Sequence, residues 1–237
     1  GVIPYGGFFA SHRVSEQVAV GFGMYGDFGS MLDYGNDWSG RYFVDEAALL
    51  GISLVPSVAY RFNDQWSMGV GLRAMNGYMN TQLAVDNTPT NNTDFNDGKA
   101  EFEDDAWGYG GNAGVIFQPQ AGTRIGLAYT SRVDLDFEDN FSIKGVQISG
   151  TGAGGALSDA ALTDAFNRLN GTTTKVDMRV PQTVTLSAFH QLNERWALLA
   201  STNWQDWSEF GEVGVKLELD QAGNIATTVD ENFDDTY

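Results

Sequence analysis

Apolar and polar residues alternate with a period of two through most of this sequence. Successive side chains of a β-strand point to opposite faces, so this alternation predicts strands with one apolar and one polar face. In the clearest case, 124–138, one set of alternate positions holds Ile125, Leu127, Tyr129, Val133, Leu135 and Phe137, and the other holds Arg124, Gly126, Ala128, Thr130, Arg132, Asp134, Asp136 and Glu138. We expect the first set to face an apolar medium and the second to face polar surroundings.

The same pattern, in stronger or weaker form, predicts seven strands. They cover 17–28, 48–61, 66–78, 106–117, 124–138, 176–190 and 196–204. Strands of soluble proteins cluster near five or six residues, whereas a tilted membrane crossing takes about 9–11. The length of these strands therefore favours an all-β fold, an antiparallel transmembrane β-barrel.

The connections between the predicted strands differ in length at the two ends. Short polar turns at 62–65, 118–123 and 191–195 alternate with long links at 30–46, 82–104, 139–174 and 217–235. Outer-membrane barrels have short periplasmic turns and long extracellular loops, so 82–104 and 139–174 are expected to be extracellular. Aromatic residues mark both ends of the strands, as interfacial girdles do: Tyr60, Trp66, Phe117 and Trp196 near the short turns, and Tyr78, Trp107, Phe137 and Trp204 towards the long loops.

Composition excludes several other classes. No stretch of eighteen apolar residues is present, which argues against a transmembrane helix, and no Cys is available for a disulfide or thiolate site. The formal net charge of −18 argues against nucleic acid as a partner. The acidic stretches 86–105 and 220–235 match no EF-hand loop, so we expect solvated loops, no metal and no cofactor.

One extracellular loop is predicted to contain a short helix at 158–170. It begins at Ser158, a suitable N-cap, and stops before Gly171. The helix would pack on the rim of the barrel or form part of a ligand groove, and the sequence leaves both open. Its apolar stripe comprises Leu157, Ala161, Leu162, Ala165, Phe166 and Leu169.

Catalysis is not expected. A hydrolase would need a Ser with a His base within hydrogen-bond reach. The only histidines, His12 and His190, both lie beside short turns, and His190 continues the apolar register of its strand. No phosphate-binding glycine loop, zinc-ligand spacing or dinucleotide fingerprint is present.

Several segments resemble, in order and spacing, strands of one known family. They are 56–72, 105–114, 128–133, 180–181, 196–198 and 204–210. Together they are similar to strands four to nine of the FadL-type outer-membrane long-chain fatty acid and hydrocarbon transporters. The resemblance covers almost the entire chain.

This resemblance implies a fourteen-stranded barrel whose lumen is plugged by an N-terminal hatch. By that comparison residues 1–237 form a single partial barrel domain that begins near the second strand and ends entering the tenth. The hatch and the last strands would then lie outside this sequence. The family resemblance implies a monomer in the bacterial outer membrane, in contact with membrane lipid and lipopolysaccharide.

The resemblance also implies passive uptake of long-chain fatty acids or other hydrophobic molecules. Extracellular loops would capture the ligand, with Leu157, Leu162, Phe166 and Leu169 as apolar candidates. The ligand would leave sideways through an inward kink in the third strand, which matches Tyr25, Gly26 and Asp27 here. A general porin for small polar solutes and an aromatic hydrocarbon channel of the same family are the alternatives.

Three arginines, Arg73, Arg132 and Arg179, fall on the polar faces of their strands and are expected to face the lumen. One of them could hold a fatty acid carboxylate through a bidentate contact. The alternative, which the sequence favours, is that each pairs with a neighbouring wall acid such as Asp134 or Asp177, because a buried charge needs a partner.

Overall fold

The computed structural model describes residues 6–35, 37–85, 97–140, 142–145, 170 and 173–209, and the backbone of 212–218 and 227–232. Within these residues almost everything is antiparallel β-strand, and helical structure is limited to one 3-10 turn, η1 (Trp207–Glu209). No helix of this part of the chain is long and apolar enough to cross a membrane. The predicted all-β class is confirmed.

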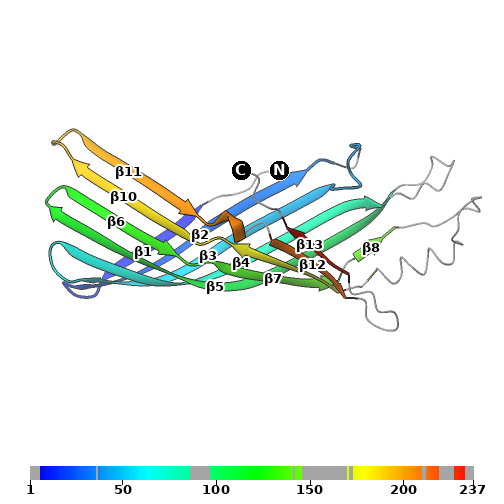
Figure 1. Ribbon diagram of the computed structural model, residues 1–237, viewed down its shortest axis with the longest axis horizontal. Coiled ribbons are helices and arrows are strands. Elements are labelled where there is room, and N and C mark those ends of the chain that lie inside the picture. The colour runs from blue at the N-terminus through cyan, green and yellow to red at the C-terminus, as the bar shows by residue number, and fades with distance from the viewer. Residues whose placement is uncertain are drawn as a thin grey trace, which may run out of the picture.

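The larger sheet is an antiparallel meander of nine strands (Figure 1). Hairpins join sequential neighbours, so strand order largely follows chain order. In spatial order it contains β1 (Gly7–Arg13), β2 (Val18–Asp33), β3 (Glu46–Arg61), β4 (Trp66–Val85), β5 (Gly98–Gln120), β6 (Thr123–Thr130), β10 (Thr183–Gln191) and β11 (Ala197–Gln205), and β8 (Ser142–Lys144) pairs with β5 outside this path.

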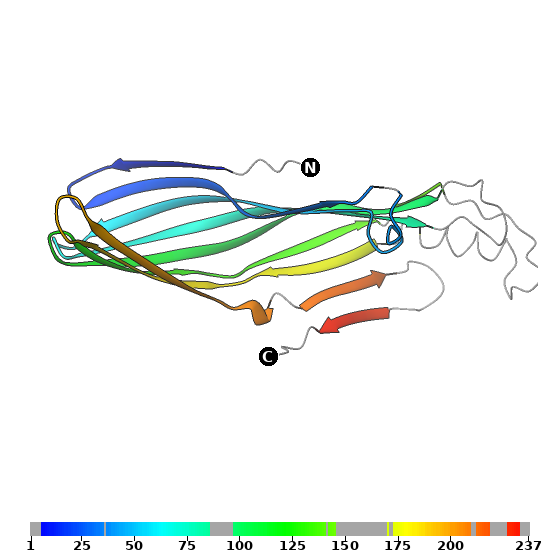
Figure 2. The same ribbon diagram turned by 90° about the horizontal axis from the view of Figure 1, so that it is seen from above.

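A smaller sheet continues three of these strands. Its order is β13 (Thr227–Asn232), β12 (Glu212–Glu218), β9 (Thr173–Val180) and β7 (Val133–Asn140). The chain passes from β6 to β7 through Ser131–Arg132, from β9 to β10 through Pro181–Gln182, and from β11 towards β12 through η1. Three neighbouring strands are thus broken at one level. Figure 2 shows the resulting wall from above as a curved, open layer running from the blue N-terminal strand to the red C-terminal strand.

The short turns lie where the sequence predicts them, and two of them share one asparagine-based geometry. Asn63 Oδ1 accepts hydrogen bonds from the backbone N–H groups of Gln65 and Trp66 at 2.9 and 2.8 Å. Asn193 Oδ1 does the same for Arg195 and Trp196 at 2.9 and 3.0 Å. Such Asx turns fix tight reversals, so sequence alone places this end of the sheet correctly.

The strands extend further than predicted on the other side. The expected loop 82–104 is shorter, because β4 continues to Val85 and β5 already begins at Gly98. Polar cross-strand pairs extend the ladder here: Tyr78 Oη donates to Glu103 (2.8 Å) and Gln82 to Glu101 (3.3 Å). These pairs lack the apolar–polar contrast from which strands were predicted, so the sequence pattern missed them.

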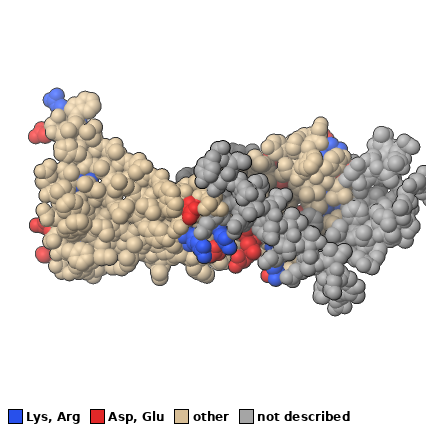
Figure 3. All heavy atoms as spheres, viewed as in Figure 1, with Lys and Arg blue, Asp and Glu red and all other residues tan. Residues whose placement is uncertain are grey.

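In the half of the wall next to the short turns, the outer face is apolar and exposed. Leu72 is 73% exposed and Leu127 is 53% exposed, although both are large and apolar. Figure 3 shows that on this face charged side chains gather at the short turns and again beyond the strand breaks, with a nearly uncharged band between. An apolar band flanked by charge is the outer surface of a transmembrane barrel. We call this half the membrane half; its outer side chains include Met68, Val70, Val115, Ile125, Tyr129, Leu186 and Trp204.

Beyond Arg73 the polarity of the two faces is reversed, and we call this region the outer half. In β4 and β5 the sequence itself changes register: inner positions become apolar, such as Met75 and Phe102, and outer positions become polar, such as Asn76 and Glu103. Met75 has no exposed surface. The outer half therefore carries its apolar core inside and its polar side chains outside, as expected of a part that protrudes into water.

Between β6 and β7 the two faces are exchanged by a break in the strand, and the sequence keeps the same alternation. Ile125 and Leu127 point outward, yet Val133 and Leu135, at the same sequence parity, are fully buried. The prediction that all six apolar residues of 124–138 share one face is therefore wrong. The break at Ser131–Arg132 turns the strand over, so that β7 lies on the inner face of β4 and β5.

The same reversal occurs between β10 and β9, where Pro181 offers no backbone N–H for a ladder. Val176, Met178 and Val180 are buried, whereas Leu186 is exposed on the outer face. A single cluster fills the space between the two sheets of the outer half. It contains Met75, Phe102, Ala106, Val133, Leu135, Phe137, Val176, Met178 and Val180.

Candidate functional site

The inner face of the membrane half is lined by small side chains. They surround a hollow of about 490 Å³ on the concave side of the wall. Small inward residues leave most of this space unfilled by the wall, although Ile116, which pairs with Ser67, also faces it. Those lining it include Ser57, Ser67, Gly69, Gly126, Ala128 and Ser187.

A β-bulge interrupts β2 at the level of the strand breaks. The β2–β3 ladder pairs Gly26 with Ile52 and Phe28 with Gly51, which leaves Asp27 without a partner in the ladder. An extra residue of this kind bends the strand and redirects its side chain. The bulge lies at the position predicted for the kink at Tyr25, Gly26 and Asp27.

The bulge directs Asp27 into a buried polar group. The Asp27 carboxylate accepts hydrogen bonds from Ser53 Oγ through Oδ2 and from Arg73 Nη2 through Oδ1. Arg73 Nε donates to Ser53 Oγ at 3.0 Å. Only 4% of the Arg73 side chain and 14% of the Asp27 side chain are exposed. The three side chains, from β2, β3 and β4, thus form a closed ion-pair group at the inner surface of the bulge.

A cavity of about 380 Å³ lies against this group. On one side it is bounded by Tyr25, Asp27 and Arg73, and on the other by the broken strands at Pro181 and by Trp207. It therefore bridges the bulge of β2 and the strand breaks across the lumen. Its apolar lining includes Phe28, Leu49, Val180 and Pro181.

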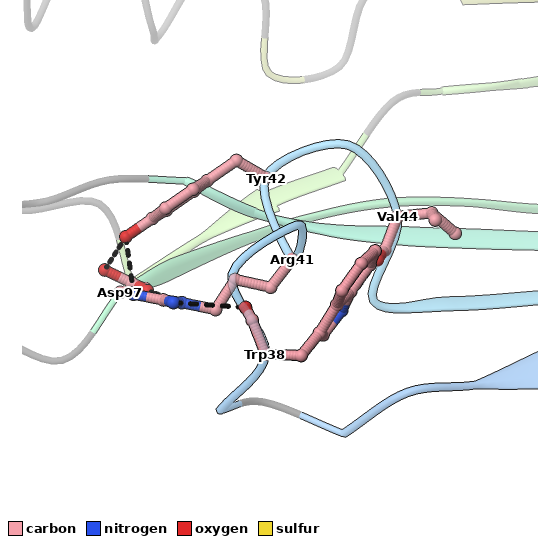
Figure 4. A network of polar contacts seen from close by, with 5 residues as sticks. All are labelled: Trp38, Arg41, Tyr42, Val44 and Asp97. Atoms are coloured by element: carbon pink, nitrogen blue, oxygen red, sulfur yellow. Dashed lines mark hydrogen bonds and ion pairs between the residues drawn. The ribbon is translucent and has the colours of Figure 1, made fainter.

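The loop between β2 and β3 is fixed at the far end of the molecule (Figure 4). Arg41 Nε forms an ion pair with Asp97 at 2.6 Å, and Arg41 also donates to Tyr42 Oη (2.6 Å) and to the carbonyl of Trp38 (3.2 Å). Trp38 Nε1 donates to the Val44 carbonyl at 3.1 Å. The hydrogen bond to the Asp97 carboxylate raises the pKa of the Arg41 guanidinium. This network ties the loop to Asp97, the residue before β5.

These features agree with a comparison to known protein families. The family of outer membrane transport proteins described as OMPP1/FadL/TodX matches residues 2–237. The chain belongs to this family. It is an outer-membrane protein, and its sheet is part of the β-barrel that the sequence predicts.

Curated relatives of this FadL-family chain are longer than it is. It is 24% identical to a long-chain fatty acid transport protein of Escherichia coli O6:H1, over 94% of this chain and 52% of the relative. It is 28% identical to outer membrane protein P1 of Haemophilus influenzae, over 86% of this chain and 46% of the relative. The chain thus spans about half the length of these proteins.

Solved structures show the same fold. A Pseudomonas aeruginosa FadL homologue superposes with a TM-score of 0.74 at 20% identity, covering 94% of this chain and 52% of its own. The Ralstonia pickettii toluene transporter TbuX superposes with a TM-score of 0.67 at 19% identity, covering 96% and 61%. At these identities the likeness concerns the fold alone.

The three arginines predicted to face the lumen do not share one location in this FadL-family chain. Arg73 is at the inner surface, paired with Asp27. Arg132 and Arg179 lie on the outer face, each near Asp134 at 3.8 and 3.7 Å. Their expected lumen position is wrong because the break at Ser131–Arg132 and Pro181–Gln182 turns both strands over. Each of the three arginines lies near an acid, as the favoured alternative predicted, but the reason given for it, burial of the charge, holds for Arg73 alone.

The remaining predicted site residues are apolar positions of the loop 139–174, and they stay a prediction. Leu157, Leu162, Phe166 and Leu169, with the expected helix at 158–170, lie outside the described residues except for Asn170. His190 Nδ1 is 2.9 Å from Thr123 Oγ1. Within the described ranges, no three His, Asp or Glu residues are grouped so as to hold a metal ion.

Sequence reasoning did not identify Ser53, Pro181 and Trp207 as parts of the site. Ser53 interrupts the apolar run 49–55, which was a usable signal, since a hydroxyl there needs a buried partner. Pro181 and Trp207 reach the cavity only because the strands break beside them. No local pattern predicts that.

Proposed function

We propose that the full protein to which these residues belong is a passive outer-membrane channel for long-chain fatty acids or other hydrophobic small molecules, and not an enzyme. One observation carries this proposal: the wall has an exposed apolar outer face, a cavity with an apolar lining lies on its inner side, and a strand bulge interrupts the wall beside that cavity. Burial of a methylene group contributes about 0.8 kcal/mol, so such a cavity attracts acyl chains and hydrocarbons from water.

The route follows from the position of the cavity. The extracellular loops, with Leu157, Leu162, Phe166 and Leu169, would capture the ligand and pass it towards the lumen. The cavity at Asp27 would receive it, and the interrupted ladder at Tyr25–Asp27 would release it sideways into the membrane. The loss of ladder pairing at Asp27 supports an exit here, because fewer backbone hydrogen bonds must open.

Relatives support the hydrophobic class and leave two ligand types open. One relative is named a long-chain fatty acid transport protein, and one structural neighbour a toluene transporter. Aromatic hydrocarbons are therefore a second candidate ligand. A porin for small polar solutes is the rival from another class. We further propose that the protein acts as a monomer in contact with outer-membrane lipid and lipopolysaccharide.

Uptake by whole cells tests the proposal. The full-length protein is expressed in a host that lacks such channels, and the uptake of radiolabelled oleate, toluene and a disaccharide is measured. We expect oleate or toluene to enter at least tenfold faster than in cells without the protein, and the disaccharide to enter no faster. Faster disaccharide entry with no gain for either apolar ligand would identify a porin instead.

A variant locates the exit. Deletion of Asp27 restores a continuous β2–β3 ladder and should reduce apolar uptake by about tenfold. Asp33→Asn, at the end of the same strand, is the matched control and should leave uptake unchanged. Full uptake by the deletion variant, with normal amounts in the outer membrane, would contradict lateral release at the bulge.

A further inference from the structure

The cavity beside the bulge is lined by one positively charged side chain, Arg73, which is already paired with the carboxylate of Asp27. Among its described lining residues, Asp27 and Arg73 are the only charged side chains, and Tyr25 is the only other titratable one. Arg73 is 5% exposed and forms an ion pair with Asp27. Ser53, with no exposed surface, bonds both. The group is therefore electrically balanced before any ligand enters.

A charged ligand would disturb this balance. An anionic head group entering the cavity would lose its water and would have to share one guanidinium with Asp27, which leaves an excess buried negative charge. Burying an ion without its own counter-charge is strongly unfavourable. An uncharged ligand meets no such barrier, because the guanidinium and the carboxylate neutralise each other.

The cavity otherwise suits an uncharged apolar molecule. Phe28, Leu49, Val180 and Trp207 provide apolar surface around about 380 Å³. A dry apolar cavity of about 150 Å³ is already enough for benzene, and ligand pockets commonly measure about 300–1,000 Å³. The space therefore accepts an aromatic ring or a folded segment of an alkyl chain.

We propose that Asp27 and Arg73 determine the ligand specificity of this cavity. Asp27 acts as a built-in carboxylate that occupies Arg73, so that the cavity selects uncharged apolar molecules over anionic ones. A fatty acid is then accepted in its protonated form, and a hydrocarbon or long-chain alcohol is accepted directly. This inference rests on the proposed function and adds the charge state of the ligand to it.

The test compares two ligands that differ only in head-group charge. Binding of 1-octanol and octanoate to the full-length protein in lipid nanodiscs is measured at pH 8, where octanoate is ionised. Signal from partition into lipid is removed by subtracting a Thr183→Trp variant, which fills the cavity. We expect octanol to bind at least tenfold more tightly than octanoate in the wild type.

Variants assign the preference to the ion pair. Asp27→Asn keeps the size of the side chain and leaves Arg73 without its carboxylate, so the octanoate-to-octanol affinity ratio should rise at least tenfold. Asp27→Asn combined with Arg73→Gln removes both charges, so the octanoate-to-octanol affinity ratio should return towards the wild-type value. Arg61→Gln, at an exposed pair with Asp64, is the matched control and should behave as the wild type.

Each outcome decides the matter. Equal or tighter binding of octanoate by the wild type overturns the inference without any variant, even if Asp27→Asn does not fold. An unchanged ratio in folded Asp27→Asn overturns it as well. If neither ligand binds above the Thr183→Trp signal, the inference and the cavity's place in the transport route both fail. If both octanol and octanoate bind, but octanoate binds as tightly as octanol, the inference fails and the proposed transport function stands.

Discussion

Ser53 illustrates how much one side chain contributes at the residue scale. It has no exposed surface, donates to Asp27 and accepts from Arg73 Nε at 3.0 Å. Each of the three residues depends on the other two, because every buried polar atom of an ion pair needs a partner. The group joins β2, β3 and β4 at the bulge, where the backbone ladder is interrupted.

Breaking this group should destabilise the barrel. Arg73→Met leaves Asp27 as a buried carboxylate without its counter-charge and should lower the unfolding free energy by about 3–5 kcal/mol. Ser53→Ala removes one partner from each charged group and should lower it by about 1–3 kcal/mol. Urea titration followed by tryptophan fluorescence, with the full-length protein in lipid vesicles, provides the measurement.

The control for both variants is an exposed ion pair of the same chemistry. Arg61→Met breaks the pair with Asp64, whose side chain is 97% exposed. It should change the unfolding free energy by no more than about 1 kcal/mol. If Arg73→Met were no more destabilising than Arg61→Met, the buried group would not hold the bulge.

At the scale of elements, the strand breaks decide which faces meet. After Ser131–Arg132, β7 lies so close to β5 that a Cβ atom on Gly108 would be 2.4 Å from the Asp134 carbonyl oxygen and 2.3 Å from Val133 Cγ1. Backbone cannot move aside as cheaply as the end of a side chain. Glycine is required here by the close approach of β7.

A single methyl group should therefore separate these strands. Gly108→Ala should cost about 1–3 kcal/mol and increase hydrogen exchange in β7 and β9, because the added atom overpacks the core. Gly69→Ala is the matched control in β4: its Cβ atom would meet nothing closer than 3.5 Å, the Val58 carbonyl oxygen. Equal protection of β7 in both variants would contradict the close contact.

The limits of sequence prediction are also visible in the strands. Alternation located β structure in all seven predicted segments, although 124–138 and 176–190 each divide into two strands. Asn63 and Asn193 marked two of the three short turns. Both signals are local. Alternation could not show that Leu127 and Val133 face opposite ways. The two residues are an even number of positions apart, which in an unbroken strand would put them on the same face, and alternation does not reveal the break between them. The partner of Arg73 was also beyond reach, because Asp27 faces it only through a bulge.

At the scale of the whole molecule, the reversal of polarity sets the depth in the membrane. The apolar outer face of the membrane half ends near Arg73, and the outer half continues into water with its core inside. Sequence predicted the barrel and its membrane from strand length and loop asymmetry. The length signal holds for β2 to β5, whereas the predicted strands 124–138 and 176–190 are each divided in two by a break. Sequence also predicted one apolar face along the whole of 124–138, whereas that face is exposed before the break and buried after it.

A charge on the outer face should report this boundary. Val70→Lys places an ammonium group against lipid and should destabilise the protein by about 2–4 kcal/mol. Asp136→Lys, on the outer face of β7, lies opposite Asp177 in water and should cost nothing measurable. The measurement is urea titration in lipid vesicles. Similar losses for the two variants would place both residues in one environment.

Spin labels on single cysteines test the central claim most directly, and residues 1–237 contain no Cys that would compete for the label. In the full-length protein in lipid vesicles, labels at positions 127, 133 and 134 are compared for collision with lipid-soluble oxygen and with a water-soluble nickel chelate. The account predicts that Leu127→Cys meets oxygen, Val133→Cys meets neither, and Asp134→Cys meets the chelate. Strong oxygen collisions at both 127 and 133, with no chelate contact at 134, would show an unbroken lipid-facing strand and contradict the account.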